Sequence, residues 1–381
     1  MLRESCIGNS MGTSTVFPKF GQASQPFTFE VIASGLDSPR GLTFGSHGAL
    51  YVAEAGKGGP GASIPSPSIP GAQVSYGASG AITRIQDGEV KRIVTGLPSL
   101  ALPDGSDASG IQDIEFDANG NAYGVFGFAS DPKYRDTIIN VPEFGNFVAI
   151  NDLDGQASFT RLADLAAYEL NNNPDGGDVI SNPYDLLIQG NTAYIIDAGG
   201  NDLLSSNIDG SGLKVENIFP TGKTINPTTG EEISYQAVPT AVTSGPDGAL
   251  YVGELTGFPF PKGQAQIFRI DSNGETEVYA DGFTNIVDLA FDKSGGLFVL
   301  EYDSDGIASG DSKGALVYLP KEGNTRLTIT SDNLISPTGL TIGPDNDIYI
   351  SNKGFTPGEG EVVRFENPFD HYFPSILGRK Y

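Results

Sequence analysis

One phrase recurs six times along the 381-residue chain, and this repetition restricts the fold more than any other feature. Each copy has a short apolar segment, a tight turn of Gly, Asp or Asn, and a second segment with an aromatic residue near its start, as in SPRGLTFGSHGALYVAE (38–54). The spacings between the aromatic residues are 72, 71, 57, 47 and 51 residues, and these residues are Tyr51, Tyr123, Tyr194, Tyr251, Phe298 and Tyr349. A period of about 40 to 50 residues, lengthened by insertions, is typical of β-propeller blades.

Each copy continues with two further strand-like segments, for example GAITRI (80–85) and EVKRIVTGL (89–97). This gives four strands per blade, which we call A to D. The sixth copy ends after three segments, and FTFEVIASGL (27–36) has the form of the missing fourth. We therefore expect an all-β, six-bladed propeller over residues 27–368, in which the N-terminal strand completes the last blade and removes the free sheet edges. Residues 1–26 and 369–381 would be terminal tails.

Connection lengths divide the expected disc into two different faces. The A–B and C–D turns are short throughout, whereas nearly all long connections are B–C or D–A, such as 55–79 and 163–181. Up-and-down strand order places these two classes of connection on the same face. Because binding residues concentrate on loops held by a rigid scaffold, we expect the functional site at the mouth of the central channel on this B–C/D–A face.

Composition excludes several classes of function. The net charge is −25, from 22 Lys and Arg against 47 Asp and Glu, and a nucleic-acid partner requires a basic surface that such a chain lacks. No segment approaches the roughly 18 apolar residues of a membrane span. A single cysteine and two histidines leave little material for Cys- or His-based catalysis or metal binding. We expect carboxylates, Tyr, Arg, Lys or a hard cation to carry any chemistry.

Acidic residues recur at two positions of the blade. Strand B ends in an acid or an amide in five copies and in Phe126 in the other, whereas strand A begins with an acid in three copies. Crowded carboxylates repel one another, so they must be protonated, paired with Arg40 or bridged by a cation. Ca²⁺ accepts six to eight oxygen ligands and is the expected cofactor. The candidate ligands are Glu54, Asp113, Asp185, Asp197, Asp288 and Asn352.

Two further roles remain open for these positions. In a structural role, the strand-end acids hydrogen-bond to loop backbone and lock the blades. In a catalytic role, Glu254 or Glu301 acts as general base, Arg40 or the metal stabilises negative charge, and Tyr184 donates a proton. Aromatic residues near the expected mouth are candidates for stacking on a flat organic ligand. They are Phe126, Phe128, Phe258 and Phe260.

The blade phrase in NPYDLLIQGNTAYIIDAGGNDLL (182–204) resembles an NHL-type repeat. The longer strings GLDSPRGLTFGSHGALYVAEAGKGG, AVPTAVTSGPDGALYVGELTGFPFPKG and GFTNIVDLAFD resemble the ScyD/ScyE family, named for scytonemin-cluster proteins of cyanobacteria, over roughly residues 28–365. The resemblance implies a six-bladed propeller that is periplasmic or extracellular, although residues 1–26 lack the pattern of a signal peptide. It supplies no catalytic residues.

These observations lead to three hypotheses about function. The first is a propeller that binds a small metabolite, for example an aromatic one, or a protein partner at the acidic mouth of its channel, with Ca²⁺ as a bridging ion in one version. The second is a metal- or carboxylate-assisted hydrolase, lyase or isomerase of secondary metabolism. The third is a structural or assembly protein of the cell surface. The fold alone does not choose among them, because propellers serve all three purposes.

Overall fold

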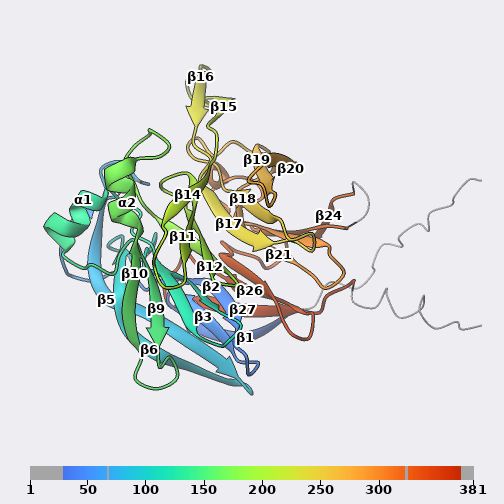
Figure 1. The fold of residues 1–381 in the computed structure, drawn as a ribbon. Helices are drawn as coiled ribbons and strands as arrows, with labels where there is room; N and C mark the ends of the chain where they lie inside the picture. The colour runs from blue at the N-terminus through green and yellow to red at the C-terminus, as the bar shows by residue number, and fades with distance from the viewer. Residues whose placement is uncertain (1–28, 67, 322–324, 370–381) are drawn as a thin grey trace, which may run out of the picture.

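Six four-stranded antiparallel blades form a ring in the computed structural model, which describes residues 29–66, 68–321 and 325–369 (Figure 1), and the short strand β4 (Ser63–Pro65) adds a fifth strand to the sheet of the first blade. The first three blades consist of β2 (Pro39–Phe44), β3 (Leu50–Glu54), β5 (Gln73–Gln86) and β6 (Glu89–Ala101); β7 (Ile111–Phe116), β8 (Ala122–Phe126), β9 (Asn146–Asn151) and β10 (Ser158–Asp164); and β11 (Pro183–Gln189), β12 (Thr192–Asp197), β13 (Asp202–Asn207) and β14 (Lys214–Ile218).

The last three blades consist of β17 (Pro239–Ser244), β18 (Leu250–Glu254), β19 (Ala265–Ile270) and β20 (Thr276–Phe283); β21 (Ile286–Phe291), β22 (Leu297–Glu301), β23 (Ala315–Leu319) and β24 (Leu327–Thr330); and β25 (Gly339–Ile342), β26 (Ile348–Asn352), β27 (Gly360–Phe365) and β1 (Phe29–Leu36). The first strands of neighbouring blades contact one another all the way round the ring. The predicted all-β, six-bladed propeller is thus confirmed.

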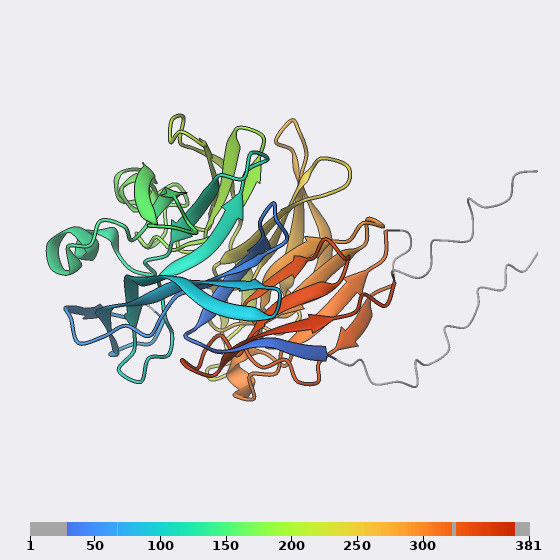
Figure 2. The same ribbon diagram turned by 90° about the horizontal axis from the view of Figure 1, so that it is seen from below.

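The N-terminal strand closes the ring. Strand β1 runs antiparallel to β27, with Phe29 opposite Phe365 and Leu36 opposite Gly360, and Figure 2 shows blue β1 beside the red strands of the last blade. This pairing confirms the closure expected from residues 27–36. The expected N-terminal tail lies outside the described residues, as does the C-terminal one except for Phe369, whose ring stacks on Tyr318 at a centroid distance of 4.0 Å.

All elements outside the blades lie in B–C or D–A connections, within the described residues. These elements are β4 (Ser63–Pro65) between β3 and β5; α1 (Pro132–Tyr134) and the π-helical turn η1 (Arg135–Ile139) between β8 and β9; α2 (Leu165–Asn172) between β10 and β11; the hairpin β15 (Gly222–Ile225) and β16 (Glu232–Tyr235) between β14 and β17; and η2 (Ile307–Ser309) between β22 and β23. The hairpin stands out from the ring in Figure 1. None of the described helices is long and apolar enough to cross a membrane.

Hydrophobic clusters lie between neighbouring blades rather than at the centre of the disc. One cluster joins Tyr51 and Ala53 of the first blade to Ile111, Phe126 and Val148 of the second, and another joins the fourth and fifth blades. This arrangement follows from the alternation of side chains across each strand, which gives every sheet two buried faces. The centre of the ring is left to the first residues of each strand A.

A β-bulge occurs near the start of strand A in the first five blades. The register between strands A and B shifts there between Pro39 and Leu42, and at the corresponding position in the next four blades. A bulge bends the strand and redirects a side chain. The recurring bulge thereby fixes the direction of the residues at the channel mouth, which simple alternation along the sequence does not.

Candidate functional site

The first strands of all six blades surround a cavity of about 110 Å³ in the central channel. Four carboxylic acids from three blades are among its lining residues. They are Asp113, Glu115, Asp185 and Asp288. The structure therefore brings together three of the six predicted metal ligands, and it adds Glu115. This residue was detectable from the sequence, because positions i and i+2 of a strand share a face.

Burial dominates the electrostatics of this cavity. It raises the pKa of Asp185 to about 6 and that of Glu115 to about 8, and it raises the pKa values of Asp113 and Asp288 well above their ordinary range. The negative charge of Asp185 adds to the shift at both of these residues. Asp113 and Asp185 also share a carboxyl–carboxyl hydrogen bond. Protons are therefore held in the channel at neutral pH.

Each channel aspartate also joins its blade to the next one. Asp113 accepts a hydrogen bond from Leu186 N at 3.1 Å, Asp185 from Val242 N at 2.5 Å, and Asp288 from Leu340 N at 2.5 Å. Two threonines make similar links at two of the three other blade boundaries: the Thr240 hydroxyl donates to Ile286 O and the Thr338 hydroxyl to Pro39 O, both at 2.7 Å. The channel residues thus stabilise the ring as well as shaping the cavity.

Gly41 provides the space that Asp113 needs. A Cβ atom at this glycine would lie 1.8 Å from Asp113 Oδ1, a distance that no side chain can accommodate without displacement. The first blade therefore carries no acid at the position that Asp113, Asp185 and Asp288 occupy in theirs.

The strand-end residues form a second ring that lies outside the cavity. Four of them accept a hydrogen bond from a backbone N–H in the loop before strand A of their own blade. The bonds are Asp37 N to Glu54 (2.7 Å), Asn182 N to Asp197 (2.6 Å), Thr284 N to Glu301 (2.8 Å) and Ile335 N to Asn352 (2.9 Å). This geometry matches the structural alternative, in which strand-end acids hold the loops.

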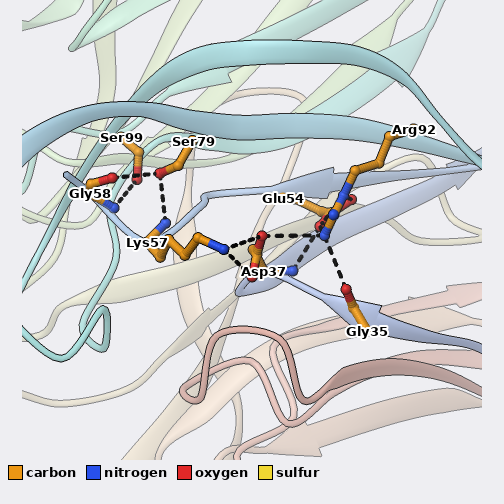
Figure 3. Close-up of polar contacts among 8 residues, drawn as sticks. All are labelled: Gly35, Asp37, Glu54, Lys57, Gly58, Ser79, Arg92 and Ser99. Carbon is orange, nitrogen blue, oxygen red and sulfur yellow. Dashed lines mark hydrogen bonds and ion pairs between the residues drawn. The ribbon is translucent and has the colours of Figure 1, made fainter.

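Glu54 has the most complete set of partners (Figure 3). It is fully buried, accepts a hydrogen bond from Thr83 Oγ1 at 2.5 Å and forms an ion pair with Arg92, whose Nη2 lies 2.6 Å from Oε2. Arg92 also contacts Asp37, and Lys57 reaches Asp37 from the other side at 3.2 Å. The charge of Glu54 is therefore neutralised within its own blade.

Glu254 and Glu301, the predicted general bases, are buried at the ends of β18 and β22. Burial raises the pKa of Glu254 to about 8 and that of Glu301 to about 7. Glu254 departs from the strand-end pattern, because it accepts its hydrogen bond from Gln266 N in the neighbouring strand. Neither residue lines the channel cavity.

Arg40 and Tyr184, two other predicted site residues, directly precede the cavity-lining Gly41 and Asp185 in their strands. Arg40 is buried and donates to the carbonyl oxygens of Pro39, Gly354 and Ala108, so it braces the surrounding loops. Burial raises the pKa of Tyr184 to about 12, and the charge of Arg40 opposes this shift. Burial also raises the pKa of Tyr302, a residue that was not predicted from the sequence, and the charge of Arg40 again opposes the shift.

The four predicted stacking residues occupy two different environments. Phe126 and Phe128 are buried, where they pack on Phe159 and Phe144 at centroid distances of 5.8 Å and 5.6 Å, and they do not face the mouth. Phe258 is 66% exposed and forms a T-shaped pair with Phe260. Only the Phe258–Phe260 pair is placed where a ligand or partner could contact it.

The six predicted metal ligands do not form one site. Asp113, Asp185 and Asp288 line the channel, whereas Glu54, Asp197 and Asn352 hydrogen-bond to separate loops. Across residues 29–66, 68–321 and 325–369, no group of three or more His, Cys, Asp or Glu side chains is arranged to hold a metal ion. The Ca²⁺ hypothesis stays a prediction that requires direct measurement.

A larger cavity, of about 540 Å³, opens on the opposite face beside the turns of the second blade. Its walls include Phe116, Tyr123, Leu153, Asp152 and Asp154, and Asp154 accepts a hydrogen bond from the Tyr51 hydroxyl at 2.9 Å. The face with short turns therefore also carries a cavity.

No protein-family model and no curated protein matches the chain. Several solved six-bladed propellers resemble it in structure. A gluconolactonase from Xanthomonas campestris is 11% identical, with 90% of each chain covered and a TM-score of 0.53. A putative gluconolactonase (11% identity, 89% of this chain and 92% of that one, TM-score 0.51) and a glucose dehydrogenase (14%, 88% and 98%, 0.50) are similarly related. At such identities the likeness shows a shared six-bladed fold.

Proposed function

We propose that this protein binds a small molecule at the mouth of its central channel, and that an amine or hydroxyl group of the ligand enters the carboxyl-lined cavity. Its main support is the set of four carboxyl groups that share one cavity: Asp113, Glu115, Asp185 and Asp288. Titratable groups with strongly shifted pKa values in a concave site are typical of functional sites. Partly protonated carboxyl groups can both donate to and accept from such a ligand group.

The cavity size limits how much of the ligand can enter. A volume of about 110 Å³ is well below the roughly 300–1,000 Å³ of ordinary small-molecule pockets. The body of the ligand would therefore lie above the channel, among the B–C and D–A loops. Tyr184 and Tyr302 lie near Arg40 at this level, and their rings offer surfaces for an aromatic ligand.

An enzyme is the second candidate, and Asp185 favours it. Burial places its pKa at about 6, which lies in the range where a carboxylate exchanges protons efficiently near neutral pH. The neighbouring Tyr184 keeps its proton, because its pKa is raised to about 12, and it can act as a hydrogen-bond donor. Some structurally similar propellers are described as gluconolactonases, so sugar lactones are the first substrates to assay.

Family, location and the remaining roles are proposals of the same kind. Membership of the ScyD/ScyE family, with a periplasmic or extracellular location, is supported by the quoted repeat strings. Ca²⁺ in the channel is supported by its carboxylate oxygens. A protein partner or a surface assembly role is supported by the exposed Phe258 on the elaborated face. Cell fractionation and elemental analysis of protein purified without chelator test these points.

A thermal-shift screen followed by calorimetric titration tests the binding proposal. The panel contains amines, polyols and phenolic compounds, and the variants are Asp113→Asn and Asp288→Asn, which keep the side-chain size. Asp209→Asn, in an exposed turn of the third blade, is the matched control. We expect a stabilising compound whose affinity falls at least about tenfold, or 1.4 kcal/mol, in both channel variants and is unchanged in the control. A panel without a stabilising compound, or equal affinity in all variants, would contradict the proposal.

A further inference from the structure

A separate group of acids lies between the second and third blades, where helix α2 meets the turn from β12 to β13. Glu169 comes from the helix, and Asp197 and Asp202 flank the turn. All three side chains are nearly inaccessible, with exposed fractions of 3%, 1% and 1%. Asp175, in the loop after the helix, also adds negative charge at Glu169 and Asp202. None of these residues lines the channel cavity.

Gly200 marks the point where these carboxyl groups converge. A Cβ atom built on this glycine would lie 3.3 Å from Glu169 Oε2, 3.4 Å from Asp202 Oδ1 and 3.6 Å from Asp197 Cγ. The side chains reach this point from a helix and from both ends of a turn. Because glycine has no Cβ, no side chain of the turn separates these groups, and their burial shows that the convergence is not a contact between surface side chains.

The oxygens at this point differ in their hydrogen bonds. Asp197 is well satisfied, because it accepts from Ser181 Oγ and from the backbone N–H groups of Asn182, Gly199 and Gly200. In contrast, Glu169 Oε1 and Asp202 Oδ1 are buried and have no hydrogen-bond partner.

A third buried acceptor without a partner lies one helical turn after Glu169. It is the amide oxygen Oδ1 of Asn173, the residue that caps the C-terminal end of α2. Buried polar atoms almost always find a partner, so three such oxygens from one short stretch and the adjoining turn call for a specific explanation.

The charges of Glu169 and Asp202 are also uncompensated. Burial and the neighbouring carboxylates raise the pKa of Glu169 to about 8 and that of Asp202 to about 9. No lysine or arginine among the described residues forms an ion pair with either one. Glu54, by comparison, has Arg92. Positive charge supplied from outside the chain would resolve this imbalance.

We propose that Glu169 and Asp202 bind a hard divalent cation of the Ca²⁺ type, with the Asn173 amide oxygen as a further ligand. Ca²⁺ takes oxygen ligands from carboxylates, amides, backbone carbonyls and water in flexible geometry. Two carboxylates and one amide are compatible with the lack of a three-acid metal group in the described part of the chain. Asp197, whose oxygens are already occupied, contributes charge and not coordination.

Such a site would fasten α2 to the β12–β13 turn. The loop after α2, residues 173–182, leads directly into β11, which carries Tyr184 and Asp185. Bound cation would therefore stabilise the connection that positions the third blade at the channel mouth. The inference does not depend on the proposed small-molecule site, which involves other carboxyl groups.

Calorimetric titration of chelator-treated protein with CaCl₂, paired with melting curves, tests the site. The variants are Glu169→Gln and Asp202→Asn, and Asp178→Asn, exposed in the same loop, is the matched control. We expect about one equivalent of Ca²⁺ to bind wild type and the control and to raise their melting temperatures. In each site variant we expect at least about tenfold weaker binding and a smaller melting shift.

Three outcomes would overturn the proposal: no heat and no melting shift in wild type, equal Ca²⁺ affinity in the site variants, or loss of binding only in channel variants such as Asp288→Asn. If one site variant fails to fold, the other decides the question. Circular dichroism without Ca²⁺ identifies a folding failure, and we expect neither site variant to be less stable than wild type in that condition, because each removes charge repulsion.

Discussion

Glu54 of the strand-end ring and the acids of the channel ring occupy neighbouring positions in the same repeat but have opposite electrostatic environments. In the strand-end ring, Glu54 is neutralised by Arg92 and by hydrogen bonds from its own blade. In the channel ring, Asp113, Asp185 and Asp288 line one cavity, and their pKa values are raised. The comparison teaches that a buried acid stabilises the fold where a cation is supplied locally and has a raised pKa where none is.

The second blade extends the comparison, because it has Phe126 at the strand-end position. This ring is fully buried and packs between the first and second blades. It shows that the position serves packing and loop attachment and does not require a carboxylate. The channel position shows no such exchange with large apolar side chains, since the residues other than aspartate there are Gly41, Ala241 and Gly339.

The largest expected effect is on the apolar member of the strand-end ring. Phe126→Ala should lower the free energy of unfolding by about 4 kcal/mol, because it leaves a cavity between two blades. Urea unfolding followed by circular dichroism measures this. Phe258→Ala, at an exposed aromatic residue, is the control and should change stability by less than about 0.5 kcal/mol. Similar losses in both variants would contradict the assignment of Phe126 to the core.

The next effect concerns the ion pair of the strand-end ring. Arg92→Met should destabilise the fold by about 3 kcal/mol, because it leaves the Glu54 carboxylate buried without its cation. Urea unfolding again measures the change. Lys57→Met, which removes a more exposed cation from Asp37, should cost less than about 1 kcal/mol. If Arg92→Met leaves stability unchanged, Glu54 does not depend on this pair.

The third prediction is that the acids of the channel ring make the free energy of unfolding depend on pH. Groups whose folded pKa is raised stabilise the protein below their unfolded pKa, and this stability is lost as pH rises through the folded value. The pKa of Glu115 is raised from 4.5 to about 8, so stability should fall between about pH 5 and 8. Glu115→Gln should reduce this decline by about 2 kcal/mol. Unfolding free energies at several pH values provide the measurement, and an unchanged slope would contradict the assignment.

The smallest effect is expected at a neutral link of the channel ring. Thr240→Val removes the hydroxyl that donates to Ile286 O across the boundary between the fourth and fifth blades. The expected loss is about 1 kcal/mol, as is usual for one hydrogen bond. Unlike the loss in stability at Glu115, it should not vary with pH. A pH-dependent difference between Thr240→Val and wild type would show that the threonine influences the channel acids.

The repeat predicted the fold almost completely, because each blade carries its own strand and turn signals and β1 matches the missing strand of the last blade. The site was predicted only in part. Asp113, Asp185 and Asp288 meet in the channel, but strand-end residues such as Glu54 do not join them. Sequence spacing places residues along a strand but does not fix the direction of their side chains. The β-bulge at the start of strand A changes this direction, and Arg92 binds the carboxylate of Glu54 at the end of strand B.

The least predictable feature was the meeting of Glu169 and Asp202, which are distant in the sequence. Glu169 and Asp202 are 33 residues apart, one on helix α2 and the other at the start of β13, and neither occupies one of the two repeated acid positions. Only the packing of α2 against the β12–β13 turn brings them to Gly200. Glu115, by contrast, follows Asp113 on the same face of β7 and could be found by extending the channel ring by two residues.

Infrared spectroscopy of the protonated carboxyl C=O stretch tests the contrast between the two rings most directly. We predict that wild type shows this band at pH 7, that Glu115→Gln weakens it, and that Glu54→Gln leaves it unchanged, because Glu54 forms an ion pair with Arg92. A band that is unaffected by Glu115→Gln, or that disappears in Glu54→Gln, would contradict the account.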